Sequence, residues 1–195
     1  MPTINRNETT EGEMAAITVG KLKPLDAPIT LVSYDPAWPA LFQREEQRIR
    51  EVLGDGVLRI EHVGSTSVPG IAAKPLIDIL LIVPDSSDED RYVAPLERRG
   101  YLLRIREPNW HQHRVLKGPD TDINLHVFSP GCVEIERMLR FRDWLRACPD
   151  DRALYERTKR ELAARTWKYV QNYADAKTAI VEEILARALP APTNP

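Results

Sequence analysis

The sequence predicts an α/β (α+β) domain, in which a mixed β-sheet of four or five strands is flanked by helices and the C-terminal portion is helical. Short apolar or alternating runs of strand length occupy the middle of the 195-residue chain, and apolar residues recur at helical spacing before and after them. The length is typical of one domain that can bury a genuine core, and no internal repeat is present. We therefore expect one domain built from packed layers of sheet and helix.

The first residues differ from the rest of the chain. Residues 1–28 are mostly polar and show no sustained period, so they are predicted to form a flexible lead to a domain that spans 29–188. Residues 29–32 could form an edge strand. A helix is expected from Asp35-Pro36 to residue 53, because proline favours the first turn of a helix and glycine follows at 54.

The sheet is predicted from five segments, which are 57–63, 76–83, 101–106, 111–117 and 121–128. The run 76–83 is too apolar for a half-exposed strand and too short for a typical helix, so we expect it to be covered on both faces. Gly118-Pro119-Asp120 predicts a hairpin between the last two strands. A helix is expected over 88–99, where Pro95 can kink or split it.

From residue 133 onward the pattern is helical. Met138, Phe141, Leu145 and Cys148 form one apolar stripe, Pro149 ends it, and further stripes follow. These helices are expected to cover one flank of the sheet. The last residues, 189–195, are rich in proline and are predicted to fray, because proline cannot continue a helix.

Composition narrows the function classes. A formal net charge of −2 argues against a general nucleic-acid binder. The two cysteines, Cys132 and Cys148, indicate neither a disulfide framework nor a zinc finger, so a reducing cytoplasm is expected. No apolar run approaches the ~20 residues that cross a bilayer, which predicts no membrane partner. The oligomeric state stays open.

The segment 61–70, Glu-His-Val-Gly-Ser-Thr-Ser-Val-Pro-Gly, is the most informative part of the chain. Gly64 permits a sharp turn and close approach to a ligand, and the next three residues offer hydroxyl and backbone donors to an anion. The predicted phosphate-binding residues here are Gly64, Ser65, Thr66 and Ser67. Asp78 follows inside the apolar strand, where a carboxylate needs a metal, a base or solvent.

Several motifs occur together and in one order along the chain. They are Tyr34-Asp35-Pro36-Ala37-Trp38-Pro39, the 61–70 segment, Lys74-Pro75-Leu76-Ile77-Asp78-Ile79, Lys117-Gly118, Asn124-Leu125-His126-Val127 and Phe141-Arg142-Asp143-Trp144-Leu145. Over residues 29–188 the sequence resembles the GrpB family, which in turn is similar to the polymerase-β-like nucleotidyltransferases. The resemblance implies a nucleotidyltransferase-like fold and a nucleotide or phosphate-bearing small molecule as partner. Members that are fused to dephospho-coenzyme A kinase also suggest such chemistry.

The sequence departs from the pattern of that superfamily at one position. Two carboxylates at i and i+2 share a strand face and can hold two magnesium ions, but Asp78 is followed by Leu80 at i+2. A Mg²⁺ ion would therefore need substrate phosphates, water or another strand. Asp122, Asn124 and His126 alternate along a later strand and could complete the site. We thus assign Asp78 and Asp122 as metal ligands, and Asp78 and His126 as catalytic residues.

Basic side chains supply further candidates. Lys74 lies four residues before Asp78 and could neutralise a phosphate, and Lys117 matches a motif of the family that the sequence resembles. Second-rank candidates are His62, Asn124, Arg114, Lys159 and Lys177. The last two each follow a tyrosine by one helical turn, which also looks like the family pattern.

Three functions remain open on these residues. The first is Mg²⁺-dependent nucleotidyl transfer, in which His126 assists as the base. The second is a degenerate module that binds a nucleotide without turnover, which Leu80 favours. The third is a transition-metal site that consists of His111, His113 and His126, since His111 and His113 would share a strand face next to His126.

Overall fold

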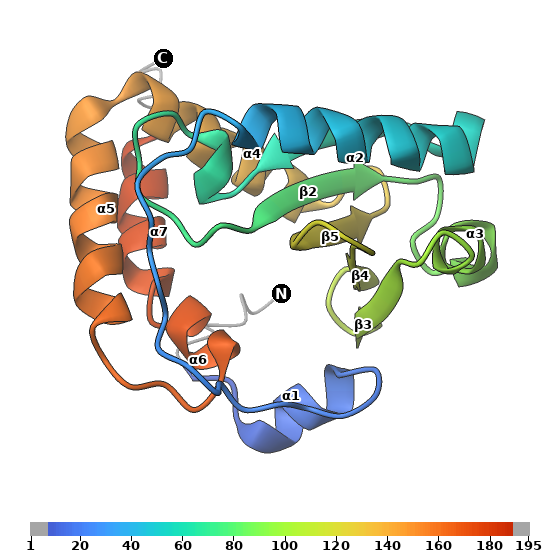
Figure 1. Cartoon of the computed structure of the whole chain (residues 1–195), viewed down its shortest axis with the longest axis horizontal. Helices are drawn as coiled ribbons and strands as arrows, with labels where there is room; N and C mark the ends of the chain where they lie inside the picture. Colours follow the sequence, from blue (N-terminus) through green and yellow to red (C-terminus); the bar gives the residue numbers. More distant parts are fainter. Residues whose placement is uncertain (1–7, 189–195) are drawn as a thin grey trace, which may run out of the picture.

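A mixed sheet of five strands forms the centre of the protein. The computed structural model describes residues 8–188, and the strands lie in the order β1-β2-β5-β4-β3 (Figure 1). Their bounds are β1 Arg59–Val63, β2 Ile77–Ile82, β3 Leu102–Glu107, β4 His113–Lys117 and β5 Ile123–Phe128. The central pair β2 and β5 is parallel and all other neighbours are antiparallel, which confirms the mixed sheet and the β4–β5 hairpin.

Helices cover both faces of this sheet. On one face, Ile77, Ile79 and Leu81 of β2 lie in one core cluster with residues of α2 (Trp38–Leu53) and α3 (Val93–Glu97). On the other face, Leu80 and Ile82 cluster with residues of α4 (Val133–Ala147). The strand is therefore covered on both sides, as its apolar composition predicts.

Three further helices stand beside the start of β2 (Figure 1). They are α5 (Pro149–Ala163), α6 (Val170–Asp175) and α7 (Thr178–Arg187). Tyr155 and Ile184 from these helices form a buried cluster with Val68 and Ile71, which follow the short 3-10 turn η2 (Ser65–Ser67). This packing places the turn between the sheet and the C-terminal helices.

The N-terminal segment differs from the expectation of a lead without structure. Residues Glu11–Ile17 form helix α1, which a capping box at Thr10 begins and the buried Met14 anchors. Residues 29–32 do not form a strand. Instead Val32 makes one isolated bridge to Ala73, and Ile29 packs against Leu162 and Tyr173 of the C-terminal helices.

The expected helix over 88–99 is split. A 3-10 turn, η3 (Glu89–Arg91), precedes the short α3, which carries Pro95 in its first turn, where its missing N–H costs nothing. A second 3-10 turn, η1 (Gly54–Gly56), closes α2. The predicted ends at 1–7 and 189–195 lie outside the described residues. Within 8–188, no helix is long and apolar enough to cross a membrane.

Candidate functional site

The turn at Gly64 lies directly on the carboxylate of Asp78. Gly64 adopts φ +69° and ψ −174°, and a Cβ placed on it would meet Asp78 Oδ2 at 2.3 Å. Asp78 is the second residue of β2 and pairs with Val63, the last residue of β1. The close approach thus requires glycine for both its backbone angle and its lack of a side chain.

Two neighbours on β5 hold the Asp78 carboxylate. Asn124 Nδ2 donates to Asp78 Oδ1 at 2.8 Å, and His126 Nε2 lies 3.6 Å from the same oxygen. Burial alone would raise the pKa of Asp78, but interactions with His126 and Asn124, together with the charge of Lys74, outweigh it and lower the pKa below its usual value. Asp78 is therefore an anion at neutral pH, and its carboxylate lies beside the side chains of Asn124 and His126.

A hydrogen-bonded chain extends from His126 across the sheet. His126 Nδ1 lies 3.1 Å from His113 Nε2, and His113 Nδ1 lies 2.7 Å from a Glu107 carboxylate oxygen. The two imidazole rings stack at 5.3 Å with an angle of 8°. Glu107 orients His113 as a carboxylate orients a metal-binding or catalytic histidine. Glu107 belongs to no motif in the sequence, although it occupies the register position opposite His113 on the neighbouring strand.

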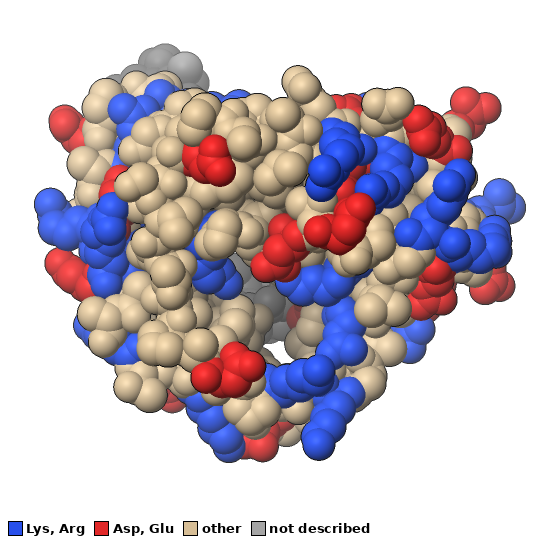
Figure 2. Space-filling view, viewed as in Figure 1, with Lys and Arg blue, Asp and Glu red and all other residues tan. Residues whose placement is uncertain are grey.

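A cavity of about 50 Å³ opens beside Asp78, between the turn and the C-terminal helices. Figure 2 shows that this face of the molecule is hollowed between the C-terminal helices and the sheet, with both basic and acidic side chains at the edge of the hollow. The cavity is lined by Leu31, Ser65, Thr66, Ala73, Lys74, Leu76, Asp78, Lys159, Tyr173 and Lys177. It therefore joins several of the predicted phosphate-binding residues to the two second-rank lysines.

Lys159 forms the buried wall of this cavity. Its ammonium group donates to Ser65 Oγ at 2.9 Å and to the Ala72 carbonyl oxygen at 2.5 Å, and only 2% of the residue is exposed. Burial, with a smaller contribution from the charge of Lys177, lowers the pKa of Lys159 to about 7. Lys159 thus holds the Ser65 side chain in place by a hydrogen bond.

Lys74 and Lys177 have more freedom to bind a ligand. Lys177 Nζ lies 4.6 Å from the centre of the Tyr173 ring, and burial lowers the pKa of both lysines. Among residues 8–188, neither ammonium group has a carboxylate or other acceptor within bonding distance. Asp78 is the only carboxylate among the lining residues that the structure describes, against three lysines, so the cavity is suited to an anion.

Thr66 and Ser67 serve the turn itself. Thr66 Oγ1 donates to the Leu76 carbonyl at 3.1 Å and receives a hydrogen bond from His62 Nε2, also at 3.1 Å. Ser67 Oγ donates to the Gly64 carbonyl at 2.6 Å and is not a lining residue of the cavity. The prediction that Ser67 faces the phosphate site is therefore corrected, because its hydroxyl closes the turn.

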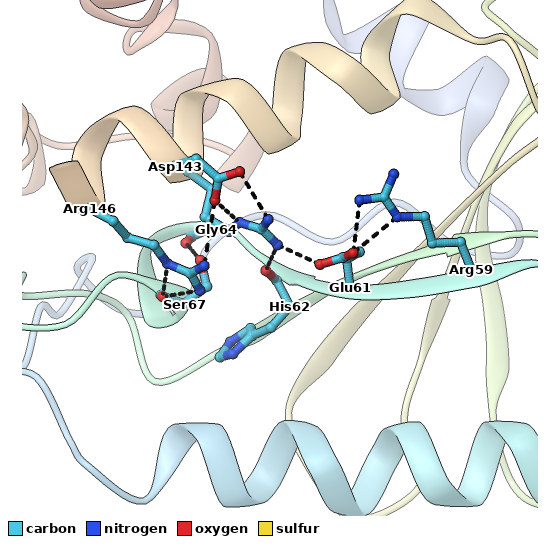
Figure 3. Close-up of polar contacts among 8 residues, drawn as sticks. Arg59, Glu61, His62, Gly64, Ser67, Asp143 and Arg146 are labelled. Atoms are coloured by element: carbon cyan, nitrogen blue, oxygen red, sulfur yellow. Dashed lines mark hydrogen bonds and ion pairs between the residues drawn. The ribbon is translucent and has the colours of Figure 1, made fainter.

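The side chains of His62 and Asp78 lie on opposite faces of the sheet, because Asp78 pairs with Val63, the residue after His62 on β1. Figure 3 shows the His62 side chain directed toward α2, and its ring stacks on Phe42 at 4.9 Å. Burial lowers the pKa of His62 to about 4, so the ring is neutral at pH 7 and donates through Nε2. It supports the turn through Thr66.

The structure separates three other candidates from the cavity. Lys117 Nζ lies 3.3 Å from an Asp122 carboxylate oxygen, which forms an ion pair across the hairpin. Arg114 is buried and binds Glu89 at 2.5 Å. None of these three lines the cavity. Asp122 thus forms an ion pair with Lys117 and does not line the cavity with Asp78, where the two carboxylates could share a metal ion.

The described part of the chain brings few metal-binding side chains together. Within the described residues, no group of three or more His, Cys, Asp or Glu side chains is arranged to hold an ion. His111 is not part of the His113–His126 pair; it lies in the preceding loop, where its ring contacts Trp110. The three-histidine hypothesis is therefore wrong in geometry. Leu80, at the position of a second strand carboxylate, is fully buried in a cluster with Ile135 and Leu139.

Comparisons with known proteins agree with this architecture. The chain is 64% identical over 184 residues to a UPF0157 protein of Halalkalibacterium halodurans, covering 94% of each chain. It is 32% identical to a protein of Mycolicibacterium paratuberculosis named dephospho-CoA kinase, and the match covers 83% of this chain but 46% of that protein. The crystal structure of the conserved protein GrpB from Enterococcus faecalis superimposes with a TM-score of 0.72 at 34% identity, covering 82% of this chain and 96% of that one. A family model described as GrpB protein matches residues 28–187, and the chain therefore belongs to the GrpB family.

Proposed function

We propose that the cavity between the 64–67 turn and the C-terminal helices binds the phosphate groups of a nucleotide or of another phosphate-bearing small molecule. The observation that carries this proposal is the excess of basic side chains, since Lys74, Lys159 and Lys177 line a cavity in which Asp78 is the sole described carboxylate. Lysine is a common phosphate ligand because its ammonium group is a compact charge with three donors.

The energetics favour a bound anion. Burial destabilises a lysine ammonium, as the lowered pKa of Lys74 and of Lys177 reflects. A phosphate oxygen placed between these two groups would supply the missing negative charge. Binding would then raise the pKa of both lysines and stabilise the folded protein.

The size of the cavity limits what it can hold. Its volume of about 50 Å³ is well below the roughly 300–1,000 Å³ typical of a pocket for a whole small molecule. The proposal therefore places only the phosphate groups inside, with the rest of the ligand toward the opening. Because some relatives are named dephospho-CoA kinase, dephospho-coenzyme A belongs among the ligands to be tested.

A magnesium ion fits this site only together with the phosphates. Asp78 is the one lining carboxylate in the described chain, and Mg²⁺ is commonly bound by one or two carboxylates plus substrate phosphates and water. Asp78 would hold the ion, which would neutralise phosphate charge when bound. Lys74 and Lys177 would then bind and orient the phosphate chain.

Thermal shift and calorimetry with pyrophosphate, ATP and dephospho-coenzyme A, each with and without Mg²⁺, test the proposal. A phosphate ligand should raise the melting temperature by mass action. Lys177→Met should weaken binding by roughly tenfold or more, as expected for the loss of one charge-assisted contact. Lys117→Met is the matched control, since Lys117 pairs with Asp122 outside the cavity. The absence of any shift with all three ligands, or unchanged binding by the Lys177 variant, would overturn the proposal.

Nucleotidyl transfer is a second candidate function. It is favoured by the placement of His126 Nε2 3.6 Å from Asp78 Oδ1, which sets a base next to the acid that lines the cavity, although His126 itself is not a lining residue. In this function the acceptor hydroxyl would attack the α-phosphorus of the triphosphate, His126 would accept the hydroxyl proton, and the bond from the α-phosphorus to the bridging oxygen would break to release pyrophosphate. The wild type should then release pyrophosphate from a nucleoside triphosphate only with Mg²⁺, and Asp78→Asn and His126→Gln should abolish or reduce the release. Binding without release in the wild type would instead support the module that lacks turnover.

A further inference from the structure

A second and larger cavity lies at the outer edge of β1. Its volume is about 560 Å³, within the roughly 300–1,000 Å³ typical of pockets for small molecules. It lies between α2, the 64–69 turn and the end of α4. The lining residues are Tyr34, Pro39, Phe42, Gln43, Glu46, Glu61, His62, Ser67, Pro69, Arg142, Arg146 and Arg152. None of these twelve residues lines the phosphate cavity beside Asp78.

One side of this cavity is aromatic and apolar. Tyr34, Pro39 and Phe42 come from the start of α2 and the residues just before it, and the Phe42 ring is held by its stack on His62. His62 is itself neutral at pH 7, because burial lowers its pKa to about 4. This wall therefore offers a rigid apolar surface without charge.

The other side of the cavity carries three arginines. One of them, Arg142, already directs its guanidinium donors to acceptors of the protein. Arg142 donates to Glu61 at 2.8 Å, to the His62 carbonyl at 3.0 Å and to Asp143 at 2.7 Å (Figure 3). Its side chain is 9% exposed. Arg142 thus covers the edge of β1 and forms part of the wall.

The other two guanidinium groups retain donors. Arg146 donates through Nε and Nη2 to the Ser67 carbonyl, while its Nη1 makes only a long contact of 3.5 Å with Asp143. Within residues 8–188, the only side-chain hydrogen bond of Arg152 is a donation of 3.4 Å to the Arg146 carbonyl. Both groups can therefore bind an added acceptor without breaking a strong contact.

The carboxylates in the lining are already occupied. Glu46 binds Arg50 at 2.9 Å, and Glu61 lies between Arg59 and Arg142. Burial, with the charge of Arg142, lowers the pKa of Arg146, as expected for a charged group that is partly removed from water. The balance of charge in the cavity thus favours an anion.

We propose that this cavity is a second ligand site, which binds a small organic anion with its aromatic or apolar body against Tyr34 and Phe42 and its anionic group on Arg146 and Arg152. The proposal does not depend on phosphate binding beside Asp78. A carboxylate and a phosphate ester share the required chemistry, since both accept hydrogen bonds from a guanidinium group.

Calorimetry and saturation-transfer NMR with three probes of one shape test the site. Benzoate and phenyl phosphate carry the two anionic groups on the same ring, and benzamide is neutral. At least one anion should bind, and benzamide should bind at least roughly tenfold more weakly. The stronger of the two anions identifies the anionic group. Arg152→Gln should weaken binding of that anion by roughly tenfold, because it removes a charge-assisted donor.

Two further variants separate this site from the phosphate cavity. Phe42→Leu should weaken binding of the aromatic anion. Lys177→Met should leave the affinity for the aromatic anion unchanged but reduce pyrophosphate binding. The Arg152 side chain makes one long contact, so its replacement should leave the melting temperature near that of the wild type. Equal binding of benzamide and benzoate, no effect of Arg152→Gln, or no binding of either aromatic anion would each overturn the proposal. The pyrophosphate measurement decides the phosphate cavity independently.

Discussion

The carboxylate of Asp78 fills the space that a side chain at Gly64 would need. A Cβ on Gly64 would lie 2.3 Å from Asp78 Oδ2 and 2.8 Å from Asp78 Cβ. The turn that carries Ser65 and the acid of the strand are therefore fixed against each other before any ligand binds. This contact makes the geometry of the cavity beside Asp78 sensitive to one methyl group.

Gly64→Ala should both destabilise the protein and weaken phosphate binding. The backbone angles at Gly64 lie in a region that costs other residues about 1–3 kcal/mol, and the clash with Asp78 adds to this. Gly70→Ala is the control, because Gly70 also has a positive φ, +81°, but a Cβ there would meet nothing within 4 Å. Denaturant unfolding and calorimetry with pyrophosphate measure both effects. Equal loss in the two variants would show that the Asp78 contact is unimportant.

Leu80→Asp should destabilise the fold rather than create a second metal ligand. Leu80 is fully buried in a cluster with Ile135 and Leu139 of α4, and an unpaired buried charge costs about 3–5 kcal/mol. Leu80→Met keeps the volume and should cost less than about 1.5 kcal/mol. Unfolding in urea measures both variants. A stable Leu80→Asp protein that binds Mg²⁺ more tightly than the wild type would contradict this account.

Most of the sheet could be predicted from the sequence because its strands are short, apolar and bounded by glycine and proline. Residues 76–83 are one example, since their composition alone indicates cover on both faces. The local sequence pattern could not show which helix packs against the turn and closes the cavity beside Asp78. Lys159 and Lys177 are far from Ser65 in the sequence. Lys159 contacts Ser65, and Lys177 lines the same cavity, only through the packing of the C-terminal helices, so the sequence ranks both below Lys117.

Lys117 shows a different limit of prediction from sequence. A motif match gives the residue type but not its partner, and Asp122 binds Lys117 across the hairpin. Residues 29–32 show a related limit. Their apolar pattern fits a strand, but Ile29 finds its contacts on Leu162 and Tyr173 rather than at the sheet edge. In each example a contact with another side chain, which the local pattern does not show, decides the outcome.

Acidification should destabilise the protein through His62. Its pKa is about 4 in the folded state because of burial, against 6.5 as the ordinary value. Between these values the unfolded chain binds a proton that the folded protein does not, so stability is fully present above pH 6.5 and falls as the pH decreases toward 4. His62→Gln keeps an N–H donor for Thr66 but does not titrate. The difference in unfolding free energy between variant and wild type should change in this window, and a constant difference would exclude His62 as the cause.

Lys159 should produce a pH dependence in the alkaline range. Burial lowers its pKa from 10.5 to about 7, so between these values the unfolded chain holds a proton that the folded protein has released. The contribution of Lys159 to the free energy of unfolding therefore rises as pH increases from about 7 to 10.5 and is constant below that window. Lys159→Met fills a similar volume without charge and should show a smaller rise, whereas Lys117→Met, at an exposed ion pair, should follow the wild type. Urea unfolding of the three proteins between about pH 6 and 10 measures the slopes, and equal slopes for wild type and Lys159→Met would show that Lys159 stays protonated when buried.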